Sequence, residues 1–314
     1  MGVVIGPPGT PAASGLPARG VNVRRKGEPL ETVRTKVSVV HLLGGNARGE
    51  LMHVDSRPGG RLTLTPDPDI TETFYLVFGE LGGDAPFDPA RVEPGDSFST
   101  AGLAEPVLLV ARAPSRLLYH ADTPLFHHLS ENLRMLRDLA VEVELKDGYT
   151  ADHCERLQNL AYATGQVLGL SAARLRLLDF ASYLHDVGKL HVPLSILDKP
   201  GKLTADEWAV VKKHPTYGRE LFEPTFLHEA GGMVEQHHER LDGSGYPFGL
   251  AGDEIGVEAA IIAVADTFDA MTTDRPYAAA RTEAEAIAEL QRLAGVHYPG
   301  EVVRAFRASL RGSV

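Results

Sequence analysis

The spacing of apolar residues changes near residue 120, and this change constrains the fold more than any other feature of the sequence. From Thr35 to about Tyr119, short apolar runs such as 61–65 and 73–78 are separated by turns rich in Gly and Pro. Regular short strands with such turns are typical of an all-β sandwich or barrel. Later, the segments 150–168, 172–185, 205–214 and 257–271 show the 3.6-residue period of helices. The chain of 314 residues is therefore expected to form an all-β and an all-α domain.

The N-terminal half carries two further signals. Residues 1–30 are rich in Pro, Gly, Ala and Arg without an apolar period, which indicates a flexible leader. Residues 72–81 and 92–96 resemble the cupin family of small jelly rolls. Metal-binding cupins usually carry a His-x-His pair before the Glu of their first motif, but residues 65–72 contain no histidine. Because the histidines of this half (41, 53, 120, 127 and 128) are scattered, we expect no metal there, but either an effector pocket or a dimerising module.

A helix is predicted to link the two domains. Its apolar residues follow a 4-3-4-3 spacing, at Leu129, Leu133, Leu136, Ala140 and Val143. This is the rhythm of a coiled coil, which would pair two chains into a homodimer. A single amphipathic helix docked on a neighbouring element explains the same spacing equally well.

Metal-capable side chains gather in two short segments of the second half, His185-Asp186 and His237-His238. Imidazole and carboxylate together suit divalent transition metals such as Fe, Mn or Zn. A capping box at Thr204 and Glu207 predicts the start of a helix, and we expect Pro215 to end that helix after His214. Candidate ligands would then lie at helix ends, as expected of a metal-dependent hydrolase.

Six segments of the second half stand out: 185–189, 199–204, 213–215, 237–247, 265–270 and 274–277. In family order, they resemble the HD-GYP family, bacterial phosphodiesterases that hydrolyse cyclic dinucleotides. The resemblance implies an all-α HD-GYP domain holding two divalent transition-metal ions, iron or manganese first, with Zn, Ni or Co as alternatives. The implied metal ligands are His153, His185, Asp186, His214, His237, His238 and Asp266.

The resemblance also implies roles for these residues. Asp186 would bridge the two metals, with His153, His185 and Asp266 completing one site and the three remaining histidines the other. A hydroxide between two such metals would be the nucleophile. Some family members hold a third metal through a Glu at the position of Tyr149, so two metals are expected here.

Three side chains are expected to contact the substrate. Lys189 and Arg275 match family positions that contact substrate phosphates. Lys189 is also expected to be catalytic, together with Asp186. The alternatives are that Lys189 is a solvated surface lysine and that Arg275 forms an ion pair. Tyr246 would either stack on a guanine or pack under its own loop. Ala278 and Leu194 depart from the basic and acidic residues common in the family.

Composition limits the partners. A net charge of −11 argues against nucleic-acid polymers, and no apolar run reaches the roughly 18 residues of a membrane span. No secretory signal is evident, and the single cysteine, Cys154, fits a reducing cytoplasm.

Together these observations predict a multidomain enzyme. The expected order is a leader (1–30), a cupin-like regulatory or dimerising β domain (31–120), a linker helix (121–145) and an HD-GYP domain (146–314). The expected activity is hydrolysis of cyclic di-GMP to pGpG and/or GMP in second-messenger signalling. A broader HD-superfamily nucleotide phosphohydrolase and a non-catalytic cyclic-dinucleotide sensor are the alternatives.

Overall fold

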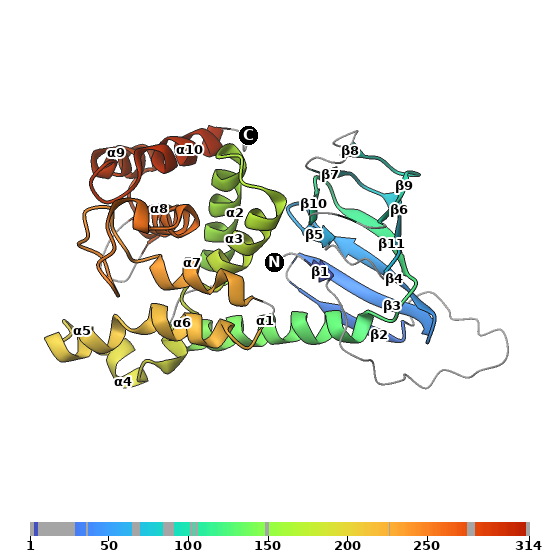
Figure 1. Ribbon diagram of the computed structural model, residues 1–314, viewed down its shortest axis with the longest axis horizontal. Coiled ribbons are helices and arrows are strands. Elements are labelled where there is room, and N and C mark those ends of the chain that lie inside the picture. Colours follow the sequence, from blue (N-terminus) through green and yellow to red (C-terminus); the bar gives the residue numbers. More distant parts are fainter. Residues whose placement is uncertain are drawn as a thin grey trace. The chain divides into compact units, whose positions relative to one another are not determined.

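The computed structural model describes residues 3–5, 29–35, 37–64, 70–83, 91–100, 103, 106–147, 151–225, 227–274 and 280–311. The chain divides into two compact units, Met1–Asp138 and Leu139–Val314. The boundary falls inside helix α1 (Phe126–Asp147), the helix expected as a linker (Figure 1). We call the first the β unit and the second the helical unit.

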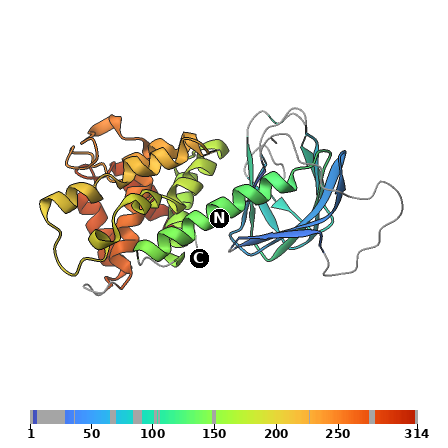
Figure 2. The same ribbon diagram turned by 90° about the horizontal axis from the view of Figure 1, so that it is seen from below.

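The β unit consists of two sheets. Strands β1 (Val3–Ile5), β5 (Arg61–Leu64), β10 (Val107–Ala111), β7 (Leu81–Gly83) and β8 (Arg91–Val92) form one sheet, in that order. The other has the order β2 (Glu31–Arg34), β3 (Ser38–Asn46), β4 (Gly49–Ser56), β11 (Ser115–Ala121), β6 (Glu72–Phe78) and β9 (Ser97–Thr100). The sheets enclose the core of the unit (Figure 2). This architecture confirms the predicted all-β, cupin-like fold.

Alternation along the strands explains the core between the sheets. In β11, Leu117, Tyr119 and Ala121 are buried, while the residues between them are more accessible. This is the two-residue period of a strand with one face on the core. The Tyr119 ring stacks on Phe74 with centroids 4.6 Å apart, and its hydroxyl donates to the buried Glu72 carboxylate over 2.5 Å. Aromatic side chains therefore fill the interior of the sandwich here.

Strand β1 differs from the sequence prediction, which assigned residues 1–30 to a flexible leader. Val3, Val4 and Ile5 pair in parallel with 62–64 of β5. Three β-branched residues in succession favour a strand, and the edge of β5 offers them backbone partners. The remainder of residues 1–28 lies outside the described part of the chain.

The start of α1 is tied to the β unit. The backbone N–H groups of Leu125 and Phe126 donate to one carboxylate oxygen of the buried Glu50, over 2.8 and 2.7 Å. Leu129, the first residue of the predicted 4-3-4-3 pattern, is buried in the core of this unit. Val143 is also buried, whereas the side chains of Leu133, Leu136 and Ala140 lie outside the described set. Homodimerisation through this pattern therefore stays a prediction.

The helical unit consists of long and short helices, and most residues of α8 are buried. Its elements are α2 (Ala151–Val167), α3 (Ala172–Tyr183), η1 (Val187–His191), α4 (Leu194–Leu197), α5 (Ala205–Val211), α6 (His214–Phe222), η2 (His228–Ala230), α7 (Gly231–Gln236), η3 (Gly252–Glu254), α8 (Val257–Thr272), α9 (Glu283–Leu293) and α10 (Gly300–Arg311). They confirm the predicted all-α fold. No helix in the described ranges combines the length and apolar character needed to cross a membrane.

The start of α5 was predicted correctly, but its end was not. The capping box at Thr204 and Glu207 begins α5 as expected. The prediction that Pro215 ends this helix was wrong, because α5 stops at Val211 and Pro215 lies in the first turn of α6. A proline is tolerated there since the first N–H groups of a helix have no partner within it.

Candidate metal centre

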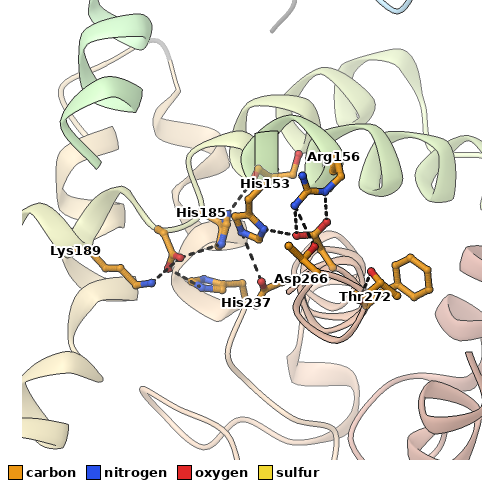
Figure 3. Close-up of polar contacts among 12 residues, drawn as sticks. His153, Arg156, His185, Lys189, His237, Asp266 and Thr272 are labelled. Carbon is orange, nitrogen blue, oxygen red and sulfur yellow. Dashed lines mark hydrogen bonds and ion pairs between the residues drawn. The ribbon is translucent and has the colours of Figure 1, made fainter. Parts of the chain in front are cut away.

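Three helix termini and two further helices supply six of the seven candidate ligands. His185 and Asp186 follow the C-terminus of α3, His214 begins α6, and His237 caps the C-terminus of α7. His153 and Asp266 project from α2 and α8. Figure 3 shows His153, His185 and His237 pointing toward one another from these separate elements. Segments far apart in sequence thus converge.

The seven predicted ligands fall into two groups. Asp186, His214, His237 and His238 each offer a ligand atom within 4.8 Å of the others, as do His153, His185 and Asp266. Asp186 reaches members of both groups. One of its oxygens lies 3.1 Å from Nε2 of His214, and the other lies 3.2 Å from Nε2 of His185. The carboxylate is therefore shared between the groups.

Three of the imidazoles are oriented in the same way. Nδ1 of His185, His214 and His237 lies 3.0, 2.9 and 2.6 Å from the carbonyl oxygen three residues earlier in the chain. Since a carbonyl only accepts, Nδ1 carries a proton in all three, and Nε2 is the ring nitrogen that can bind a metal ion. This places three Nε2 atoms at the centre of the site.

These three nitrogen atoms have no hydrogen-bond partner among the described residues. Nε2 of His185, His214 and His237 and one oxygen of Asp186 are buried and unsatisfied among the described residues. Buried polar atoms without partners are rare in proteins and call for an unseen water or ion. Imidazole nitrogen and carboxylate oxygen are ligands of divalent transition metals, so the donor set fits such ions.

His153 is held by residues that the sequence analysis missed. Its Nδ1 lies 2.7 Å from a carboxylate oxygen of Asp269, which also accepts two hydrogen bonds from Arg156 over 2.6 and 2.9 Å (Figure 3). Burial alone would raise the pKa of Asp269, but the bonds from His153 and Arg156 outweigh it and lower that pKa to about 2. The signal was helical spacing, because Arg156 and Asp269 each follow a predicted ligand by three residues.

Asp186 supplies a negative charge to the site. Burial disfavours its ionisation, but the charges of Lys189 and His185 hold its pKa well below the usual range. Burial is also the main cause that lowers the pKa values of His237 and His238 well below normal. For His185, the neighbouring Asp186 outweighs burial and raises the pKa to about 9.

Lys189 lies on η1, and its ammonium donates to Asp186 over 2.8 Å. Gly188, just before it, permits close packing of η1 on α6. A Cβ atom at this glycine would lie 1.8 Å from the carbonyl oxygen of His214. Only glycine therefore lets the segment with Lys189 approach the segment with His214.

The loop after His238 places Tyr246 at the site. Its ring stacks on His238 with centroids 4.6 Å apart and an interplanar angle of 28°. The buried Glu239 carboxylate accepts the backbone N–H groups of Phe248 and Leu250 over 2.8 and 3.0 Å. Glu239, which the sequence analysis also missed, therefore fixes this loop.

The structure leaves some predicted positions undescribed. Arg275, Tyr149 and Ala278 lie outside the described residues, so the predicted phosphate contact and the third-metal position stay predictions. Leu194 begins α4 and is 50% exposed.

A match to a protein family shows the family of this chain. The family described as HD domain matches residues 134–302, more than half of the chain. The chain belongs to the HD domain family. The helical unit is therefore called the HD unit from here on, and the resemblance stated from the motifs is confirmed at the level of the family.

Two curated relatives match this HD unit. The cyclic di-GMP phosphodiesterase response regulator of Xanthomonas campestris pv. campestris is 46% identical over 158 residues, 49% of this chain and 42% of the relative. The 3'3'-cGAMP-specific phosphodiesterase 2 of Vibrio cholerae is 37% identical over 172 residues, 54% of this chain and 33% of the relative. The chain thus spans less than half the length of these relatives.

One solved structure is similar to part of the chain. An RmlC-like cupin from Shewanella frigidimarina covers 33% of this chain and 93% of its own, at 14% identity and a TM-score of 0.29.

Proposed function

We propose that the HD unit hydrolyses a phosphodiester bond of a cyclic dinucleotide, with cyclic di-GMP as the preferred substrate and pGpG and/or GMP as products. The observation that carries this proposal is the set of unpartnered, buried Nε2 atoms around the shared Asp186 carboxylate. The relative named as a cyclic di-GMP phosphodiesterase supports the substrate.

The proposed cofactors are two divalent transition-metal ions, iron or manganese first. One would be held by His153, His185 and Asp266 and the other by His214, His237 and His238, with Asp186 shared. When bound, such ions polarise a phosphoryl oxygen and lower the pKa of water enough to provide hydroxide near neutral pH. The donor set supports this proposal because every member offers nitrogen or oxygen and Asp186 supplies negative charge.

The chain's own residues would prepare the site for this chemistry. Asp269 accepts from Nδ1 of His153 and so directs Nε2 toward the centre. Lys189 forms an ion pair with Asp186, and its positive charge is proposed to contact a substrate phosphate as well. Tyr246, which stacks on His238, is proposed to contact a base. Arg275 is proposed as a second phosphate contact.

A second substrate is favoured by a specific observation. The relative from Vibrio cholerae is named as specific for 3'3'-cGAMP. Both molecules are cyclic dinucleotides with two phosphodiester bonds, so the same metal centre and lysine would serve either. We therefore propose cyclic di-GMP first and 3'3'-cGAMP as the alternative.

The other classes of function receive less support. A general HD-superfamily phosphohydrolase needs only the His, His-Asp and Asp ligands, whereas His214, His237 and His238 also converge here. A non-catalytic sensor would be expected to have lost ligands, and the described site keeps all seven.

For the whole protein, we propose a cytoplasmic homodimer whose β unit dimerises or binds an effector. The single cysteine and the spacing from Leu129 to Val143 support this proposal.

Turnover of both dinucleotides by the full chain, purified and metal-loaded without oxygen, tests the proposed function. Chromatography of the products should show cleavage of cyclic di-GMP. Asp186→Asn keeps the shape of the shared ligand but removes its charge, so turnover should fall by at least about 100-fold together with metal content. Asp198→Asn, at an exposed aspartate, provides the matched control. Unchanged turnover and metal content in Asp186→Asn would refute the role of Asp186.

A further inference from the structure

A second kind of cluster lies in the β unit, on the face of the six-stranded sheet that points away from the core. His41 of β3 and His53 of β4 are directly paired across the two strands, and Asp55 follows His53 by two residues. Residues two apart on a strand share a face. Met52 and Val54, which alternate with this pair, are buried on the opposite face. The register of one hairpin therefore brings two imidazoles and a carboxylate together.

The three side chains lie within the reach of one ion. Each offers a ligand atom within 4.8 Å of the other two, and all three are partly buried. The two imidazole rings contact each other edge to face, with centroids 4.4 Å apart. Nε2 of His53 lies 3.4 Å from an oxygen of Asp55, yet it is buried and has no hydrogen-bond partner among the described residues. As in the HD unit, an unsatisfied imidazole nitrogen points at a carboxylate.

Neighbouring residues orient two of these groups. The hydroxyl of Thr32 lies 2.8 Å from Nδ1 of His41, so it can fix the tautomer that leaves Nε2 with a lone pair. Arg116 donates to both oxygens of Asp55, over 2.5 and 2.8 Å. A carboxylate has about four lone-pair positions, so two remain. Metal-binding histidines and carboxylates are typically held by such outer hydrogen bonds.

The charges around these three side chains favour an ion that prefers nitrogen ligands. The candidate ligands are two imidazoles and one carboxylate, and Arg116 already donates to that carboxylate. Because Arg116 and Arg34 add positive charge nearby, a hard cation such as Mg²⁺ or Ca²⁺, which needs several anionic oxygens, is disfavoured. Zn²⁺ takes imidazole and carboxylate ligands and tolerates a single anionic one.

We infer that His41, His53 and Asp55 form a zinc site on the outer face of the β unit, in addition to the centre of the HD unit. Three protein ligands leave the fourth position of a tetrahedral ion to water or to an incoming group. The absence of a His-x-His pair led the sequence analysis to expect no metal in this half. Here two histidines come together because His41 and His53 are paired across β3 and β4, not because they are close in sequence.

Zinc stoichiometry of the full chain tests this site. Wild type, His41→Gln and His53→Gln are dialysed against buffered Zn²⁺ and their metal content is measured per chain. Each variant should hold one zinc fewer than wild type, while the ions of the HD unit are common to all three. His120→Gln, at an exposed histidine of β11 in the same sheet, is the matched control and should keep the wild-type content.

The outcomes separate this inference from the proposed function. Equal zinc content in wild type and in both correctly folded variants, checked by circular dichroism, would overturn it. Loss of the additional zinc from wild type to a weak chelator would identify adventitious binding and would overturn it as well. Hydrolysis of cyclic dinucleotides should be measurable in every variant, and its absence in wild type would count against the proposed function alone.

Discussion

At the scale of single residues, the candidate metal centre depends on groups other than its proposed ligands. Backbone carbonyls orient His185, His214 and His237, whereas His153 depends on the side chain of Asp269. A carbonyl cannot be removed by mutation, but a carboxylate can. His153 is therefore the ligand whose orientation is easiest to test.

Asp269→Asn should weaken metal binding and turnover by about 10- to 100-fold, because the amide can present its donor instead of its acceptor to His153. Metal titration followed by chromatography of the products would measure both effects. Asp253→Asn, at an exposed aspartate of η3, should behave like wild type. If both variants bind metal equally well, His153 does not need the Asp269 carboxylate.

Tyr119→Phe should destabilise the β unit by about 1.5–3 kcal/mol, because it removes a donor to the buried Glu72 carboxylate. Urea unfolding followed by circular dichroism would report the loss. Tyr75→Phe is the matched control in the same sheet, since that side chain is 46% exposed and its change should be nearly neutral. Equal midpoints for the two variants would contradict the importance of the Tyr119–Glu72 bond.

At the scale of elements, the site is assembled by the approach of η1 to α6. No side chain separates the two at Gly188, where a Cβ atom would also lie 2.5 Å from the backbone nitrogen of Gly218. Since backbone atoms cannot move aside as a flexible side chain can, a larger residue must displace η1 itself. Lys189 and Asp186 would move with it.

Gly188→Ala should therefore lower both the stability of the HD unit, by about 1–3 kcal/mol, and its affinity for metal. Thermal unfolding and metal titration would measure the two effects. Gly232→Ala is the matched control, because a Cβ atom there meets nothing within 4 Å and alanine favours the helix α7. A Gly188→Ala protein with normal metal affinity would show that η1 can be displaced without consequence.

The sequence predicted those parts of the site that lie in local motifs. The seven candidate ligands and the capping box of α5 could be identified because neighbouring residues carry the whole pattern. The Asp269–Arg156 pair was missed because it requires α2 and α8 to pack, and the His41–His53 pair because it requires the register of the β3–β4 hairpin. Strand β1 was missed because its partner β5 lies more than fifty residues further along the chain.

At the scale of the whole molecule, the division inside α1 predicts that the HD unit can work by itself. A fragment of residues 139–314 should fold, bind its metals and retain turnover, because the described ligands all come from this unit. Sedimentation, metal analysis and product chromatography on the fragment would check this. It should also lose dimerisation or the response to an effector if the β unit has the role proposed for it. A fragment that binds no metal would show that the HD unit needs the β unit to fold.

The bonds from Glu50 to the start of α1 have a consequence for solvent exchange. Amides in the first turn of a helix usually exchange with water quickly because no carbonyl of the helix accepts them. The amides of Leu125 and Phe126 instead donate to a buried carboxylate on β4. Their exchange with deuterium should be slow for as long as β4 and α1 stay together. These two amides therefore report on whether the sheet still holds the helix that runs from one unit into the other.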